Sequence, residues 1–248
     1  MKTSFKKQIH FIIQGKGGCG KSLLALILGM YFKINKKKKC AFYDIDQVNT
    51  TFTQYENLDV KHLRITEVDN LNEINPRLLD DVVQKIIDTD AEVVVVDTGS
   101  NTFLNLLNYL VQNQIFDIFY GMDFSVYIHT VIVGSGDYND TLNGAKAIIE
   151  NLSIPVIIWV NEYFGPAIEK LKNSELNSDS YEHKQSILAY MLLTKPNEKL
   201  LGQDLVLMIT NRLTLQEVES SEIFSFVSRI RIKKHFADVF AKLDAIKF

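Results

Sequence analysis

Short runs of β-branched and aliphatic residues alternate along the chain with longer stretches in which apolar positions recur every three or four residues. The short runs predict strands, and the longer stretches predict amphipathic helices. The run Glu92–Asp97 is apolar without interruption between its charged ends, which is typical of a strand buried on both faces of a parallel sheet. This alternation predicts an α/β fold, with a doubly wound, mainly parallel sheet and helices on both faces.

The expected elements follow one another over the whole length. The expected strands are His10–Ile13, a run that begins near Ala41 and ends within Tyr43–Gln47, Glu92–Asp97, Ser125–Val133, Pro155–Val160 and Ile187–Leu193. The expected helices are Lys21–Phe32, Pro76–Ile87, Asn101–Leu110 and Tyr138–Leu152, followed by a C-terminal helical segment from about residue 204 to 248. No proline- or serine-rich linker divides the sequence, so we expect one domain over residues 1–248.

Composition narrows the class of protein. The 248 residues are 46% hydrophobic and 23% charged, as in globular chains and unlike disordered or fibrous ones. A net charge of −3 gives no reason to expect that the chain binds nucleic acid over a broad surface. The two cysteines, Cys19 and Cys40, cannot build a disulfide framework, and no Cys/His cluster suggests a metal centre. No apolar run has the length of a membrane span, so we expect a cytoplasmic protein.

A glycine-rich segment lies between the first expected strand and the first expected helix. Gln14–Ser22 reads Q-G-K-G-G-C-G-K-S and matches the pattern G-x-x-x-x-G-K-[ST]. Glycines allow backbone N–H groups to converge on phosphate oxygens, and the start of a helix adds a positive end. In this pattern Lys21 neutralises phosphate charge and Ser22 binds Mg²⁺. The predicted phosphate-binding residues are Gly15, Lys16, Gly17, Gly18, Cys19, Gly20, Lys21 and Ser22.

Carboxylates end two of the expected strands. Asp44 and Asp46 lie two residues apart at the end of the second strand, and Asp97 ends the apolar run. The carboxyl ends of parallel strands carry the site in open α/β sheets. Like charges that converge there are stabilised by a cation, so we expect Mg²⁺ beside them, with Gly99 allowing the backbone to approach the terminal phosphate. Aspartates also start turns, which is the alternative for each of them taken alone.

The early lysine of the loop, Lys16, gives the motif K-G-G-x-G-K-S, which resembles the deviant Walker A motif of the ParA/MinD class of P-loop ATPases. The resemblance implies ATP and Mg²⁺ as cofactors and an ATP-sandwich homodimer in which Lys16 reaches the partner's phosphates, in the manner of an arginine finger. It implies that Lys16, Lys21 and Asp46 are catalytic, with Asp46 orienting the attacking water. It further implies metal-binding roles for Ser22, Asp44 and Asp97 and an adenine contact for Asn161; a solvated lysine and a turn-forming asparagine are the alternatives for Lys16 and Asn161.

Further strings, in order along nearly the whole chain, resemble the TraL/StbB family of plasmid conjugal-transfer and stability ATPases. They are Gln14–Ser22, Asp44–Phe52, His129–Ile132, Trp159–Glu162 with Gly165 and Pro166, Gly202–Leu205, and Leu213 with Thr214. The resemblance implies a slow ATPase that switches between monomer and dimer in conjugal transfer or plasmid positioning, beside a separate DNA-binding partner. The chain departs from the family at Gln47, where proline is usual, and in the second switch, where Asp97–Phe103 reads D-T-G-S-N-T-F in place of a D-N-G-A-S-S-F-like string.

Two segments and one activity leave alternatives open. Lys36–Lys39 is either a solvated loop or a small phosphate-backbone patch for DNA. The C-terminal segment combines an apolar stripe with Arg229, Arg231, Lys233 and Lys234, so it either packs on the domain or lies on the inner membrane, as in MinD-type relatives. A kinase or ligase that transfers phosphate to a small acceptor is the alternative activity on the same fold.

Overall fold

The computed structural model describes residues 6–67, 69–71, 73–134 and 136–248. A seven-stranded sheet runs through the molecule in the order β3-β2-β4-β1-β5-β6-β7, and each neighbouring pair is parallel. The strands are β1 (Gln8–Ile12), β2 (Cys40–Asp44), β3 (Lys61–His62), β4 (Val93–Asp97), β5 (Ser125–Val133), β6 (Val156–Asn161) and β7 (Ile187–Leu193). The predicted doubly wound α/β sheet is confirmed, and it is parallel throughout.

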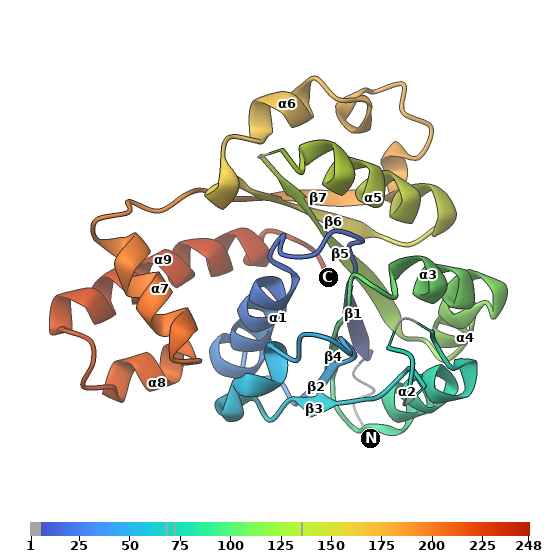
Figure 1. Cartoon of the computed structure of the whole chain (residues 1–248), viewed down its shortest axis with the longest axis horizontal. Coiled ribbons are helices and arrows are strands. Elements are labelled where there is room, and N and C mark those ends of the chain that lie inside the picture. Colours follow the sequence, from blue (N-terminus) through green and yellow to red (C-terminus); the bar gives the residue numbers. More distant parts are fainter. Residues whose placement is uncertain (1–5, 68, 72, 135) are drawn as a thin grey trace.

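Helices cover both faces of the sheet (Figure 1). They are α1 (Lys21–Gly29), α2 (Pro76–Asp88), α3 (Phe103–Gln112), α4 (Ile115–Gly121), α5 (Tyr138–Asn151), α6 (Ile168–Lys172), α7 (Leu201–Thr210), α8 (Leu215–Ser220) and α9 (Phe226–Asp244). Helices α2 to α6 contribute to the core on one face, whereas α1 and α7 to α9 contribute to the core on the other. The order of the strands places β1, β4 and β2 side by side, so the turns that follow them meet at one edge.

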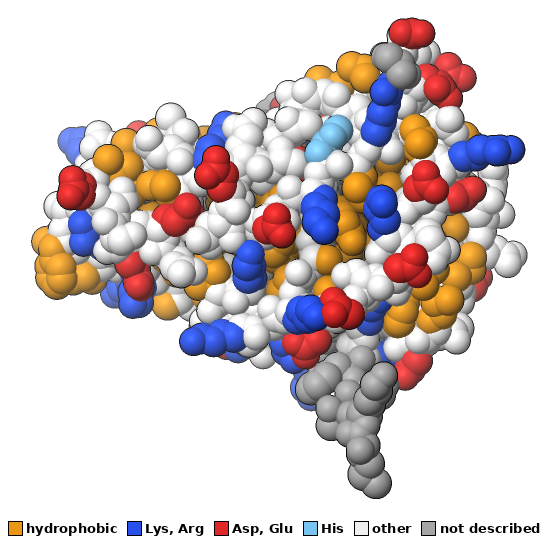
Figure 2. All heavy atoms as spheres, turned by 90° about the horizontal axis from the view of Figure 1, so that it is seen from below, with side chains coloured by type: hydrophobic (Ala, Val, Ile, Leu, Met, Phe, Trp, Pro, Cys, Tyr) orange, Lys and Arg blue, Asp and Glu red, His pale blue; other side chains and the backbone are white. Residues whose placement is uncertain are grey.

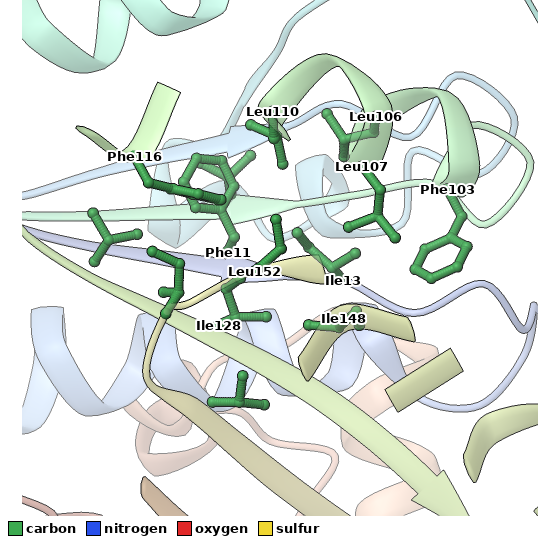
Figure 3. Packing of buried hydrophobic residues seen from close by; sticks show 14 of the residues in the cluster. Phe11, Ile13, Phe103, Leu106, Leu107, Leu110, Phe116, Ile128, Ile148 and Leu152 are labelled. Carbon is green, nitrogen blue, oxygen red and sulfur yellow. The ribbon is translucent and has the colours of Figure 1, made fainter. Parts of the chain in front are cut away.

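The central strands are apolar on both faces because both faces are covered. On β4, Val94 and Val96 belong to the core under α2 to α6, whereas Val93 and Val95 belong to the core under α1 and α9. Figure 3 shows the first of these cores, where side chains of α3 and α5 lie over β1 and β5. Burial on both sides explains why the sequence of β4 is apolar without alternation.

The C-terminal segment folds back on the domain as three helices. α7 begins at Leu201, slightly before the expected start near residue 204, and Ser225 begins α9 by accepting a hydrogen bond from the Ser228 N–H (3.1 Å). The apolar stripe of α9, including Ile232 and Phe236, is buried in the core that α1 shares. The stripe therefore packs on the domain from Ile232 onward, whereas Phe226, Val227 and Ile230 at the start of α9 are exposed. No helix among the described residues combines the length and apolar character needed to cross a membrane.

Gln14 connects the loop after β1 to α5. Its buried amide nitrogen donates hydrogen bonds to the Val131 carbonyl (2.8 Å) and the Thr141 carbonyl (3.0 Å). Gly144 lies opposite in α5, where an added Cβ would come within 2.0 Å of Gln14 Oε1. The absence of a side chain at Gly144 therefore leaves the space that the Gln14 amide fills.

Replacing Gly144 with alanine is expected to destabilise the protein, although a glycine-to-alanine change inside a helix ordinarily stabilises it by about 0.5–1 kcal/mol. Alanine would displace the Gln14 amide from its buried partners, and we expect the free energy of unfolding to fall by about 1–3 kcal/mol. Urea unfolding measures the change. Gly121→Ala in α4 is the matched control, because nothing lies within 4 Å of its added Cβ. Equal stability of the two variants would show that Gln14 does not constrain α5.

Candidate functional site

The glycine-rich loop joins β1 to α1 at the carboxyl edge of the sheet. Gly18 and Gly20 have φ angles of 71° and 111°, in the left-handed region that favours glycine. Gly15 packs against α3, since an added Cβ would lie 2.8 Å from a ring carbon of Phe103. The sequence thus supplies glycine where the loop turns and where it meets its neighbour, and the main chain can curl around an anion.

Lys21 and Ser22 begin α1 and face the interior of the loop. Lys21 is only 7% exposed, and its ammonium donates a hydrogen bond to the Lys16 carbonyl (3.0 Å). A cavity of about 410 Å³ opens beside them, which we call the phosphate cavity. It is lined by Gly17, Gly18, Gly20, Lys21, Ser22, Leu23, Asp46, Asn49, Thr51 and Ser100. The structure therefore brings most of the predicted loop residues, together with Asp46, around one space.

Asp97 and Asp44 end neighbouring strands directly beside one another. They are paired in the register of β4 and β2, and both side chains are fully buried. Burial raises the pKa of Asp97 to about 7, although the Ser22 hydroxyl and the Lys21 ammonium oppose the shift. The Ser22 hydroxyl lies close to the Asp97 carboxylate, but neither carboxylate oxygen has a hydrogen-bond partner of good geometry among the described residues. A buried carboxylate of this kind, next to Ser22, suits a hard divalent cation such as Mg²⁺ and its water ligands.

The turn after β2, residues 44–49, is held by its own carboxylates, and we call it the switch turn. Asp44 Oδ1 accepts a hydrogen bond from the Asp46 N–H (3.0 Å), and burial raises the pKa of Asp44 to about 6. Asp46 Oδ1 accepts from the N–H groups of Val48 (2.9 Å) and Asn49 (3.0 Å). Gly99 approaches from the loop after β4, where an added Cβ would lie 3.1 Å from Asp46 Oδ1. Gly99 thus lies against Asp46, which lines the phosphate cavity, although Gly99 itself does not line it.

Lys16 points toward the start of α5. Its ammonium lies 2.8 Å from Asp137 Oδ1 and 3.1 Å from Asp140 Oδ2, and these carboxylates raise the pKa of Lys16. Lys16 does not line the phosphate cavity of its own chain. Cys19 is buried in the same loop, and burial raises the pKa of its thiol. The ion pairs of Lys16 involve half-exposed groups, so little free energy is needed to release the lysine.

Asn161 ends β6 behind the loop and is 4% exposed. Its side-chain nitrogen donates a hydrogen bond to the Cys19 carbonyl (3.1 Å), and its side-chain oxygen accepts one from the Tyr163 N–H (3.1 Å). One side-chain N–H and one lone pair remain for a ligand. Asn161 thus supports the loop in addition to facing the space described next.

A second cavity of about 330 Å³, which we call the apolar cavity, adjoins the phosphate cavity and shares Gly20 and Leu23 with it. Its walls come from α1, α7, α9 and the turns after β6 and β7; they include Ile27, Asn161, Phe164, Leu193, Thr194, Leu205, Ile209 and Phe236. The sequence analysis indicated one residue of this cavity, Asn161, through its predicted adenine contact, and did not indicate the other walls. The position of Leu193 and Thr194 at the end of a parallel strand is a further signal that could have indicated it.

The lysine run Lys36–Lys39 lies among carboxylates. Lys36, Lys38 and Lys39 form ion pairs with Asp244, Glu92 and Asp90, respectively. Basic and acidic side chains are likewise interspersed over the face of the molecule seen in Figure 2. These pairs reduce the positive field that a DNA backbone would meet, which favours the solvated loop.

Comparison with known proteins adds sequence relatives and fold neighbours. No protein-family model matches the chain. Protein TraL of Escherichia coli is 32% identical over 240 residues, covering 96% of this chain and 98% of the relative. MinD of Pyrococcus horikoshii, solved with Mg-ADP, superposes with a TM-score of 0.55 at 11% identity, over 96% of both chains. A MinC:MinD complex of Aquifex aeolicus gives a TM-score of 0.54 at 14% identity, over 97% of both chains.

Proposed function

Because this chain belongs to the TraL family and has the P-loop NTPase fold of MinD, we propose that it is an ATPase of the ParA/MinD class. The observation that carries the proposal is the pair of adjoining cavities, one polar and one apolar. The phosphate cavity has the loop glycines, a buried lysine and the Asp46 carboxylate, and the buried Asp97 lies next to Ser22, as a triphosphate with a divalent cation requires. The apolar cavity adjoins the phosphate cavity at Gly20 and Leu23, so the ribose and base of a nucleotide whose phosphates lie in the first cavity would extend into the second.

In this proposal the loop residues Gly15 to Ser22 hold the phosphates through their N–H groups, with Gly99 close to the terminal phosphate. Lys21 turns its ammonium from the Lys16 carbonyl to the phosphate oxygens. Ser22 and Asp97 hold Mg²⁺, and Asp44 orients its outer waters. The bound cation supplies neutralisation of the charge on the phosphates. Asn161 keeps its hydrogen bond to the loop and offers its remaining N–H to the adenine ring.

Asp46 is the residue proposed to orient the attacking water. One of its carboxylate oxygens accepts the Val48 and Asn49 N–H groups, which fixes the side chain. The other is available to the phosphate cavity that Asp46 lines. A carboxylate held in this way orients the attacking water but does not neutralise the charge on the transferred phosphate. We therefore expect slow turnover.

Binding of ATP is proposed to produce a face-to-face homodimer in which Lys16 contacts the partner's phosphates. Lys16 rests on the Asp137 and Asp140 carboxylates at the surface, and is therefore available to a second chain at little cost. Hydrolysis would then return the dimer to monomers, so the output of the ATPase is a switch.

The proposed biological role is conjugal DNA transfer or plasmid stability, with a separate DNA-binding partner and a cytoplasmic location. The paired lysines of Lys36–Lys39 and the net charge of −3 support a partner that binds DNA in place of this chain. Isothermal titration of the pure protein with MgATP, MgADP and MgGTP tests the nucleotide site. Sedimentation velocity with and without ATP tests the dimer. Absence of binding heat for adenine nucleotides would refute the proposal, and phosphate transfer to a small acceptor would favour the kinase alternative.

Binding of MgATP is expected to release protons below neutral pH. The cation needs Asp97 and Asp44 as carboxylates, whereas burial raises their pKa values to about 7 and about 6. Protonated groups must therefore lose a proton on binding, and the affinity rises with pH until both are ionised without the ligand. We expect about 1.4 protons released at pH 6, roughly 0.9 from Asp97 and roughly 0.5 from Asp44, measured by titration calorimetry in buffers of different ionisation enthalpy. An affinity that is constant between pH 5.5 and 8 would contradict this assignment.

A further inference from the structure

Gln47 lies in the middle of the switch turn, and its side-chain amide is fully engaged. Nε2 donates hydrogen bonds to the Ile45 carbonyl (3.0 Å) and the Leu63 carbonyl (3.1 Å). Oε1 accepts from the Ile65 N–H (3.2 Å) and, at the limit of a hydrogen bond, from the Thr66 hydroxyl (3.4 Å). A primary amide has two N–H donors and two lone pairs, so each has a partner here.

These bonds extend the pairing of β2 with β3 beyond the end of β2. The last backbone rung runs from the Leu63 N–H to the Asp44 carbonyl (2.9 Å). The main chain of the switch turn then leaves the sheet, and the amide of Gln47 takes up the Leu63 carbonyl and the Ile65 N–H in its place. An amide side chain has the same donor and acceptor as a peptide group, which is why it can continue a ladder that the backbone has left.

The residue before Gln47 is Asp46, which lines the phosphate cavity. A second contact from the edge strand reaches the same place, since the His62 ring nitrogen Nε2 lies 3.3 Å from the Asp46 carbonyl oxygen. We propose that Gln47 is a positioning residue, which ties the switch turn to residues 63–66 and so holds Asp46 at the phosphate cavity. This inference rests on the proposed function, in which Asp46 orients water.

The stretch that follows β3, residues 63–67 and 69–71, which we call the edge segment, also contacts the loop after β4. The Asn101 side-chain nitrogen donates a hydrogen bond to the Leu71 carbonyl (2.8 Å), two residues beyond Gly99. The segment therefore touches both loops that flank the phosphate cavity: residues 63–66 through Gln47, and Leu71 through Asn101. A shift of the edge segment would therefore move both Asp46 and Gly99. The hydrogen bonds of Gln47 thus influence the position of two loops at the site, in addition to the stability of the switch turn.

Gln47→Leu tests the role, because leucine keeps much of the volume and removes the amide. We expect kcat for ATP to fall about 10- to 100-fold, as small misplacements of a positioning group do, while KM and the Kd for MgADP change less than about twofold. A loss of stability alone would not separate kcat from KM in this way. Gln185→Leu is the matched control, because it makes the same change at an exposed position just before β7, on the opposite edge of the sheet.

Hydrogen exchange measures the tie directly in the nucleotide-free protein. In Gln47→Leu the amides of residues 45–49 and 63–66 are expected to exchange about tenfold faster, and those of β5 unchanged. The role of Gln47 would be overturned if Gln47→Leu leaves hydrogen exchange unchanged. It would also be overturned if Gln47→Leu leaves kcat unchanged while Asp46→Asn loses turnover. Both results would leave the proposed function standing. A wild-type protein without ATP turnover would instead overturn the proposed function, and this role of Gln47 with it.

Discussion

Lys21→Ala is expected to lose MgATP binding almost entirely. The ammonium is buried in the loop and currently donates to the Lys16 carbonyl, so it can turn to phosphate oxygens without crossing solvent. Removal of one partner from a buried charge pair costs about 2–5 kcal/mol, which corresponds to roughly 30- to several thousand-fold in affinity. Titration calorimetry with MgATP and MgADP measures this loss directly.

The control for Lys21→Ala is Lys33→Ala. Lys33 also donates to backbone carbonyls, those of Asn57 (2.8 Å) and Leu58 (3.0 Å), but it lies beyond the end of α1 and away from the cavities. Its loss should lower stability slightly and leave nucleotide affinity unchanged. If Lys21→Ala is folded and binds MgATP as tightly as the wild type, the loop does not hold the phosphates and the proposed function is wrong.

Much of the fold could be predicted from the pattern of apolar residues, and the exceptions have physical causes. Strand β5 has the predicted limits, Ser125–Val133, because an element buried on both faces leaves a long apolar signal. Strand β3 was missed because Lys61–His62 is two residues long, exposed and polar. The predicted helix Lys21–Phe32 ends as an α-helix at Gly29 and continues as a π-helical stretch over Met30–Asn35, a change in hydrogen bonding that periodicity does not report.

The candidate site could be predicted where it is local in sequence and not where it depends on packing. The loop residues and the three aspartates at the ends of β2 and β4 gather at one edge, as the order of motifs in a parallel sheet requires. Apart from Asn161, the walls of the apolar cavity were not predicted, because they come from segments as distant as α1 and α9. The contact between Gln14 and Gly144 was not predicted either, because Gly144 belongs to no motif and lies far from Gln14 in the sequence.

Lys16→Ala is expected to bind MgATP with the affinity of the wild type and to lose ATP-dependent dimerisation. The ammonium of Lys16 faces Asp137 and Asp140, not the phosphate cavity of its own chain, so its removal leaves that cavity intact. A lysine that acts in trans contributes as an arginine finger does, and such groups are worth about 10³–10⁵-fold in turnover. Sedimentation velocity with ATP and the rate of phosphate release measure the two effects.

The carboxylates at the start of α5 decide how a result with Lys16→Ala is interpreted. The double variant Asp137→Asn with Asp140→Asn removes the ion-pair partners of Lys16 and keeps the lysine. If Lys16 acts in trans, its ammonium stays available to the second chain, and ATP-dependent dimerisation should be no weaker than in the wild type. If the lysine instead serves to fasten the loop to α5, the double variant and Lys16→Ala should lose the same property. Normal ATP-dependent dimerisation of Lys16→Ala would exclude the trans contact as the cause of dimerisation, because the dimer would then form without the Lys16 ammonium. Neither Lys16 nor the two aspartates line the phosphate cavity, so we expect Lys16→Ala and the double variant to bind MgATP equally. A difference in dimerisation between them then reports the contact of the Lys16 ammonium with the second chain.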